Sequence, residues 1–151
     1  AEELAQIAIN AGDAAKALGI DPSIAMLSFS TKGSGENPIL EPIRKAIEIV
    51  KSKRKYQIDG ELQGDAAVNL DSASRKCPNS AVAGKANVLV FPNLTSANIT
   101  VHLLRQFSDL QFIFGFYVGM KKPITILGRS STVQEISDSL VMCAAQANMF
   151  G

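Results

Sequence analysis

The sequence predicts an α/β fold in which a mostly parallel sheet is covered by helices on both faces. Short apolar runs alternate along the chain with stretches whose apolar residues recur at helical spacing, and this alternation is typical of βαβ units. The chain has 151 residues, of which 46% are hydrophobic and 19% are charged, enough for one globular domain with its own core. No internal repeat or linker divides the sequence.

The first elements follow from hydrophobic spacing. Residues 4–18 carry apolar side chains every three or four positions and are followed by Gly19, which predicts an opening helix. Residues 24–29 form an apolar run between polar turns, as expected for a strand buried on both faces. A proline opens the next periodic stretch, residues 42–50, and proline is tolerated in a first helical turn. Residues 56–59 predict a further strand.

The second half continues the alternation. Predicted strands cover residues 86–91, 111–114 and 123–127. Predicted helices cover residues 72–76, residues 96–107 and a closing segment that starts at Thr132. Thr132 and Glu135 have the spacing of a capping box, in which each residue's side chain bonds the other's backbone N–H. We therefore expect the last helix to begin at this pair.

Charge and composition exclude several classes of function. The net charge is +1 and aromatic residues make up 6% of the chain, so neither a basic field nor stacking platforms indicate nucleic acid binding. No apolar run approaches the roughly 20 residues of a membrane-spanning helix. The first residues lack the layout of a signal peptide, and we expect a cytoplasmic protein that binds no membrane.

Isolated reactive residues are interpreted as structural. The basic run at residues 51–55 fits the end of a helix, where positive charge favours the helix dipole. Cys77 and Cys143 are far apart and are expected to be reduced. His102 is expected on a helix surface, and Asp59, Glu61 and Asp65 as turn and surface carboxylates rather than a divalent metal site. No metal site is predicted.

Three loops at predicted strand ends are candidate binding sites, because ligands of open α/β sheets bind beyond the carboxyl ends of the strands. The first spans residues 28–35, where glycines allow close backbone approach and hydroxyls and a lysine are suited to phosphate. Its candidate contacts are Ser28, Ser30, Thr31, Lys32, Gly33 and Ser34. The Gly-Lys-Ser/Thr ending of a nucleotide P-loop is missing, and a plain polar turn is an equal alternative.

The other two loops lead into helices. Residues 91–99 contain Asn93, which suits either a helix cap or a ligand contact, and Asn98, a binding candidate. Residues 127–135 carry Arg129 at a helix entrance, where anions bind favourably and arginine holds phosphate through paired hydrogen bonds. A purely structural cap competes with binding at this third loop.

Three longer stretches, residues 25–34, 59–67 and 78–94, resemble the phosphate acetyltransferase and butyryltransferase family. The resemblance implies a three-layer α/β architecture like that of isocitrate and isopropylmalate dehydrogenases, usually dimeric, with an acyl-CoA bound in a cleft between subdomains. It also implies that residues 1–151 are the C-terminal half of the family's fold, with the amino-terminal part absent. Acetyl-CoA or coenzyme A is the implied ligand.

The family's closing motif, Ser-Arg-Gly-Cys-Ser-Val-Glu-Asp-Ile, is altered in this sequence. Its serine aligns with Gly128, its arginine with Arg129 and its aspartate with Glu135. The resemblance makes Arg129 and Glu135 the catalytic candidates if the protein is active. An arginine of the family on the preceding helix aligns with Gln106, or with Arg105 after a shift of one residue.

Three functions are compatible with this pattern. Because the altered motif and residues 122–148 resemble the phosphotransacetylase-like C-terminal domain of bacterial hybrid malic enzymes, our leading hypothesis is allosteric acetyl-CoA sensing. The oxidoreductase chemistry, with NADP and a divalent metal, would then belong to an absent malic enzyme domain of the same polypeptide. The alternative is an active phosphate acetyltransferase that moves acetyl between acetyl phosphate and coenzyme A. In the third, the helices after Ser96 and Thr132 serve only as an interface between copies.

Overall fold

The computed structural model describes residues 1–113 and 115–150. Its backbone contacts divide the chain into two units, Ala1–Asn98 and Ile99–Gly151. The first unit contains a three-stranded sheet with the spatial order β2-β1-β3. Strand β1 covers Ser23–Leu27, β2 covers Gln57–Leu62 and β3 covers Val88–Val90. Both pairings are parallel, which confirms the predicted sheet type.

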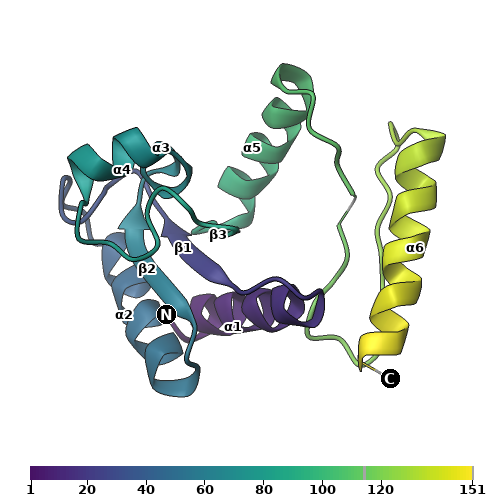
Figure 1. Cartoon of the computed structure of the whole chain (residues 1–151), viewed down its shortest axis with the longest axis horizontal. Helices are drawn as coiled ribbons and strands as arrows, with labels where there is room; N and C mark the ends of the chain where they lie inside the picture. Colours follow the sequence, from purple (N-terminus) through teal and green to yellow (C-terminus); the bar gives the residue numbers. More distant parts are fainter. Residues whose placement is uncertain (114, 151) are drawn as a thin grey trace. The chain divides into compact units, whose positions relative to one another are not determined.

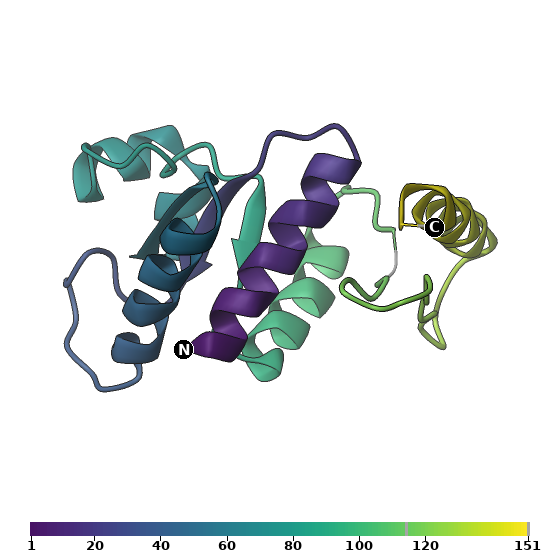
Figure 2. The same cartoon turned by 90° about the horizontal axis from the view of Figure 1, so that it is seen from below.

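Helices cover both faces of this sheet, so the predicted layering is also confirmed (Figure 1). The helices of the first face are α1, Glu2–Ala17, and α2, Leu40–Lys53, which run side by side (Figure 2). The second face carries the short helices α3, Gly64–Val68, and α4, Leu70–Lys76. A parallel sheet needs such cover, because both of its faces are apolar.

The core lies in two clusters that β1 separates. Ile24 and Met26 point into the cluster with α1 and α2, whereas Ala25 and Leu27 point into the cluster with α3 and α4. This is the alternation that a strand imposes on successive side chains. All four residues are at most 7% exposed, so the strand runs through the middle of the unit, and the loop after it starts from a fixed point.

The second unit is organised differently from the prediction. Helix α5, Leu94–Phe107, begins in the first unit and continues into the second, which ends with α6, Val133–Phe150. Residues 111–113 form no strand, and the predicted strand's last residue, Phe114, lies outside the described residues. Residues 123–127 contribute one antiparallel bridge, between Thr125 and Phe116. Both strand predictions were therefore wrong, because an apolar run becomes a strand only where a partner strand takes its backbone hydrogen bonds.

Other elements agree with the sequence more closely. The basic run closes α2, with Lys51 and Lys53 in the last helical turn, and His102 is exposed on α5. Cys77 and Cys143 are free thiols. Helix α3 was missed because five residues give too short a hydrophobic pattern. Within the described part of the chain, no helix has the length and apolar character needed to cross a membrane.

Candidate functional site

The loop after β1 makes a tight turn. Its glycine and hydroxyl residues made it a candidate from the sequence, but they did not predict its backbone conformation. Its backbone adopts left-handed angles at two successive residues, with φ of 49° at Lys32 and 82° at Gly33. Glycine accepts this region freely, whereas for other residues it is uncommon and unfavourable by roughly 1 kcal/mol or more. Contacts from outside the loop must therefore hold Lys32 in place.

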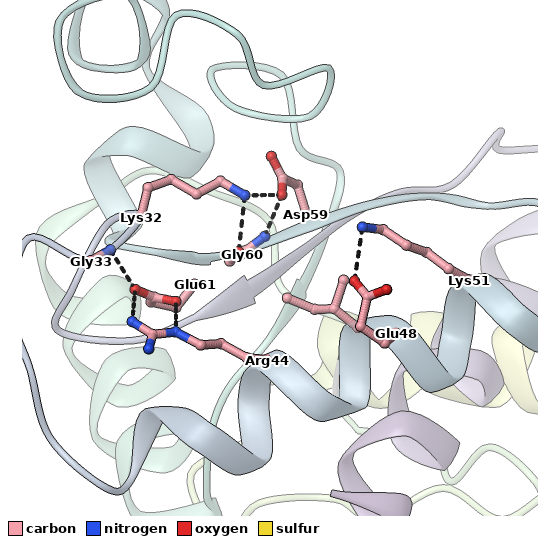
Figure 3. A pocket seen from close by; sticks show the side chains of 9 residues that line it. Lys32, Gly33, Arg44, Glu48, Lys51, Asp59, Gly60 and Glu61 are labelled. Atoms are coloured by element: carbon pink, nitrogen blue, oxygen red, sulfur yellow. Dashed lines mark hydrogen bonds and ion pairs between the residues drawn. The ribbon is translucent and has the colours of Figure 1, made fainter.

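The carboxylate of Glu61 on β2 supplies such contacts (Figure 3). Its Oε1 accepts hydrogen bonds from the Ser30 hydroxyl at 3.1 Å and from the Gly33 N–H at 2.8 Å. The Arg44 guanidinium on α2 grips the same carboxylate with two parallel hydrogen bonds, Nε to Oε2 at 2.9 Å and Nη2 to Oε1 at 3.0 Å. The backbone carbonyl of Glu61 also accepts from the Lys32 N–H at 3.1 Å.

A local irregularity of β2 explains why Glu61 points inward. The strand pairing runs from Met26 with Gly60 to Leu27 with Leu62, so Glu61 is skipped in the register. Such a bulge breaks the alternation of side chains and re-aims the extra residue. Glu61 is 2% exposed and its neighbour Leu62 is fully buried, so the carboxylate lies inside the fold.

Arg44 sets the charge state of this buried group. Its guanidinium, with smaller help from the Gly33 N–H and Ser30, lowers the pKa of Glu61 from 4.5 to about 2, although burial acts in the opposite direction. Glu61 is therefore a carboxylate at every physiological pH. The prediction of a surface carboxylate was wrong for Glu61. The spacing of residues along a strand predicts neither a bulge nor a contact with an arginine on another element.

Lys32 is held by a second carboxylate. Its ammonium group contacts the Asp59 carboxylate and donates to the Gly60 carbonyl at 3.0 Å, and the Ser80 hydroxyl also donates to Asp59. Burial raises the pKa of Asp59, but the hydrogen bonds from Lys32 and Ser80 outweigh it, and the net shift is downward. A phosphate would have to compete with Asp59 for Lys32.

The remaining candidates in the loop fall into two groups. Ser30 and Thr31 are buried, and Thr31 Oγ1 accepts from the Gln63 N–H at 3.0 Å. Ser34 is exposed, and its hydroxyl accepts from the Thr31 N–H at 3.0 Å. Ser28 is partly buried. The hydroxyls of Ser30 and Thr31 thus shape the loop from inside, whereas Lys32, Gly33 and Ser34 form its exposed tip.

A pocket of about 400 Å³ opens between the loop, α2 and β2 (Figure 3). Its lining residues are Lys32, Gly33, Arg44, Ile47, Glu48, Lys51, Asp59, Gly60 and Glu61. Each of its cations has a carboxylate partner: Lys32 with Asp59, Arg44 with Glu61, and Lys51 with Glu48 at 3.1 Å. This balance favours a structural pocket over an anion site.

At the second loop, the structure shows where Asn93 and Asn98 lie. The Asn93 Oδ1 accepts from the Ser96 N–H at 2.9 Å, so Asn93 is the helix cap that we allowed as its alternative role. Asn98 is exposed on α5, the last residue of the first unit. Its role as a ligand contact stays a prediction.

The third loop belongs to the second unit. Thr132 and Glu135 form the predicted capping box: the Thr132 N–H donates to Glu135 at 2.7 Å, and the Glu135 N–H donates to the Thr132 hydroxyl at 3.2 Å. The Arg105 guanidinium also donates to Glu135 at 2.6 Å. Arg129 is exposed and forms no ion pair with any residue in the described ranges. It is therefore open to an external anion.

The contacts of Glu135 bear on its chemistry. The Thr132 N–H, followed by the charge of Arg105, lowers the pKa of this carboxyl group. A carboxylate with a lowered pKa binds protons weakly, and both of its oxygens already accept hydrogen bonds. Among residues 1–113 and 115–150, no cluster of three histidine, cysteine or acidic side chains is arranged to hold a metal ion.

Comparison with known proteins identifies the family. Residues 1–144 match the family described as phosphate acetyl/butaryl transferase. The chain belongs to this family. It is 47% identical to a phosphate acetyltransferase of Haemophilus influenzae and 43% identical to one of Thermoanaerobacterium thermosaccharolyticum, in each case over 97% of its length. A phosphotransacetylase structure from Streptococcus pyogenes matches 97% of this family member with a TM-score of 0.89 and 44% identity.

These comparisons correct the leading hypothesis. The relatives at this identity are phosphate acetyltransferases, so the expectation of an acetyl-CoA-sensing domain of a malic enzyme was wrong. It gave two altered positions, Gly128 and Glu135, more weight than the similarity along the rest of the chain. This family member spans 21% of the length of the Haemophilus protein and 45% of the Thermoanaerobacterium protein.

Arg44 and Gln63 also shape the site, although neither was predicted from the sequence. Arg44 lies on α2 directly after Ile43, which is buried in the core, and one charged residue on an amphipathic helix carries no signal of its own. Gln63 contacts the Thr31 hydroxyl from the end of β2. Their positions in the sequence do not show how far they lie from the loop. The pairing of β1 with β2 brings Gln63 to it, and the packing of α2 on the sheet brings Arg44.

Proposed function

We propose that the complete protein carrying this segment is a phosphate acetyltransferase, and that these residues form the C-terminal half of its catalytic fold. The observation that carries the proposal is the similarity to phosphate acetyltransferases along nearly the whole chain. In this reaction the thiol sulfur of coenzyme A attacks the carbonyl carbon of acetyl phosphate. The new C–S bond forms, the C–O bond to phosphate breaks, and the thiol proton passes to a base.

The residues divide between binding and chemistry. The loop tip of Lys32, Gly33 and Ser34, with Ser28, Ser30 and Thr31 behind it, is proposed to contact the coenzyme A ester together with Asn98. In this proposal Lys32 exchanges its ion pair with Asp59 for the ligand. Arg129 is proposed to stabilise the negative charge that develops on the acetyl phosphate. Its exposure and its lack of an ion pair among the described residues support this role, since an arginine already paired would bind an added anion less well.

Glu135 is proposed to act through Arg105 rather than as the thiol's base. Its lowered pKa and its hydrogen bonds to Thr132 and Arg105 favour a carboxylate that orients a guanidinium.

We also propose a homo-oligomer as the working form. In support of this part, α5 exposes large apolar side chains such as Ile99, Leu103 and Phe107 at a spacing of four residues.

The test is acetyl-CoA formation from acetyl phosphate and coenzyme A by the complete protein, followed through the absorbance of the thioester. Removing a charge-stabilising group typically lowers turnover by about 100-fold or more, and we expect this of Arg129→Ala. Glu135→Gln is expected to lose about tenfold, since only the alignment of Arg105 is weakened. Arg75→Ala, an exposed arginine of α4, is the matched control and should retain full activity.

Three outcomes would contradict parts of the proposal. A wild-type protein without turnover would remove the function itself. An Arg129→Ala variant with turnover equal to that of Arg75→Ala would remove the role of Arg129. Loss of about a thousandfold or more in Glu135→Gln, together with loss of the acid limb of the pH profile, would instead identify Glu135 as the general base.

A further inference from the structure

The internal hydrogen bonds of the binding loop close its turn, but none of them involves the backbone N–H of Lys32. Within residues 30–35, one backbone hydrogen bond is formed, from the Ser34 N–H to the Thr31 carbonyl at 3.1 Å. The hydroxyls of Ser30 and Ser34 add short-range bonds to Gly35 and Thr31. These bonds close the turn but leave the left-handed conformation of Lys32 unexplained, because such strain persists only where surrounding groups over-determine it.

Glu61 is the outside group that bonds residues on both sides of the turn, whereas Asp59 contacts the Lys32 side chain and Gln63 contacts Thr31. One carboxylate oxygen accepts from both the Ser30 hydroxyl and the Gly33 N–H, and these residues flank Lys32 and Thr31. The loop therefore wraps around a buried negative charge. A buried carboxylate without a compensating cation is strongly unfavourable, so Glu61 can hold the loop only if a cation holds Glu61.

Arg44 is that cation, and α2 fixes its position. Its neighbour Ile43 is 2% exposed and Ile47, one turn later, is 4% exposed, both in the cluster that joins α2 to the sheet. The guanidinium reaches Glu61 through two parallel hydrogen bonds, the geometry in which arginine is most specific. The packing of α2 on the sheet thus fixes Arg44, Arg44 holds the Glu61 carboxylate, and that carboxylate holds the loop.

We propose that Arg44 and Glu61 are positioning residues that hold the loop of residues 30–35 in the conformation that binds the coenzyme A ester. This inference rests on the proposed function for the identity of the ligand. Neither residue needs to contact the ligand. Their effect falls on binding rather than on the chemical step, because they act on the loop and leave Arg129 unchanged.

The test combines loop dynamics with kinetics in the complete protein. In Arg44→Gln, we expect amide hydrogen exchange at Gly33, measured by NMR, to accelerate by about tenfold or more, because its acceptor carboxylate loses its partner. The KM for coenzyme A should rise by about tenfold or more, with kcat changed by less than about threefold. Arg44→Lys should recover part of both effects, since it restores the charge without the paired hydrogen bonds.

The matched control is Arg54→Gln. Arg54 donates to both oxygens of Asp13 at 3.2 and 3.1 Å, an arginine–carboxylate pair of the same type at the other end of α2. It should leave the exchange at Gly33 and the KM unchanged. Glu61→Gln provides a second disruption of the pair in case Arg44→Gln does not fold, and it should also accelerate exchange at Gly33.

Each contrary result has a distinct meaning. If Arg44→Gln and Glu61→Gln both fold and leave the exchange at Gly33 unchanged, Arg44 and Glu61 do not hold the loop, whatever the activity. Faster exchange with an unchanged KM would overturn their role in binding. If Arg54→Gln changed the exchange at Gly33 and the KM as much as Arg44→Gln does, the effect would come from lower stability of the whole protein and not from the loop. A wild-type protein that makes no acetyl-CoA would refute the proposed function, while the exchange measurements would still decide whether Arg44 and Glu61 hold the loop.

Discussion

At the scale of single residues, the loop after β1 depends on one buried carboxylate. Glu61 gathers donors from two segments, the loop and α2: its carboxylate accepts from Ser30 and Arg44, and its backbone carbonyl accepts from the Lys32 N–H. Its 2% exposure would be unfavourable for an isolated charge. The bidentate contact from Arg44 makes that burial possible, so the two residues act as one unit.

The lowered pKa of Glu61 leads to a prediction about acid stability. A carboxyl group whose pKa falls from 4.5 to about 2 on folding stabilises the fold above pH 4.5, and that contribution is lost as the pH falls towards 2. The full contribution is about 3 kcal/mol, of which about 2 kcal/mol is lost between pH 5 and pH 3. Urea unfolding of wild type and Glu61→Gln at both pH values measures this.

The expected result is a smaller pH dependence in Glu61→Gln, because an amide does not titrate. Asp13 also has a lowered pKa, through its hydrogen bond from Arg54, and remains in both proteins, so its share cancels in the comparison. If wild type and variant lose the same free energy of unfolding between pH 5 and pH 3, Glu61 does not make this contribution.

At the scale of elements, the first unit is held by close contacts between helices and strands that sequence spacing does not specify. Gly12 on α1 faces the ring of Tyr56, which precedes β2. A Cβ atom at position 12 would lie 2.8 Å from the Tyr56 ring and 3.1 Å from Ile24. The glycine is therefore a packing requirement, although glycine is the poorer helix former.

Gly12→Ala is expected to cancel or outweigh the stability that alanine adds to a helix. Alanine would gain about 1 kcal/mol in helix propensity, but the clash with Tyr56 costs about 1–3 kcal/mol in a packed core, so the net change is unfavourable or near zero. Gly64→Ala is the control, because nothing lies within 4 Å of its Cβ position at the start of α3. Thermal unfolding should give a lower Tm for Gly12→Ala than for Gly64→Ala, and the reverse order would contradict the packing argument.

At the scale of the whole molecule, the two units differ in what holds them. The first contains both apolar clusters. In the second, the buried residues among those described are polar, Ser139 and Gln146, and its links include the ion pair of Arg105 with Glu135 and the hydrogen bond from Gln111 to Asp138 at 2.9 Å. Polar contacts at partly exposed positions stabilise much less than a packed core.

Hydrogen exchange of the 151-residue chain should therefore be uneven. The amides of β1 and α2 are expected to exchange near the rate set by global unfolding, and those of α6 at least about 100-fold faster, because local opening of α6 exposes little buried apolar surface. Mass spectrometry of peptides from each element measures this. Equal protection of α6 and β1 would show that the second unit is stabilised by more than the contacts described.

The amino-acid sequence by itself determined the fold class, most of the helices, the capping box of Thr132 and Glu135, and the family. These depend on local periodicity, on short-range side-chain contacts and on residue identity along the chain. It could also name the loop of residues 28–35 as a candidate, because glycine and hydroxyl residues follow a buried strand.

The tertiary structure alone decided how that loop is held. Arg44 and Glu61 come later in the sequence than the loop, on α2 and β2, and the bulge in β2 turns Glu61 inward against the rule of alternation. It also decided that residues 123–127 form no strand. The physical reason is the same in each case: strand pairing and burial of charge depend on partners that are distant in sequence, and local spacing carries no information about them.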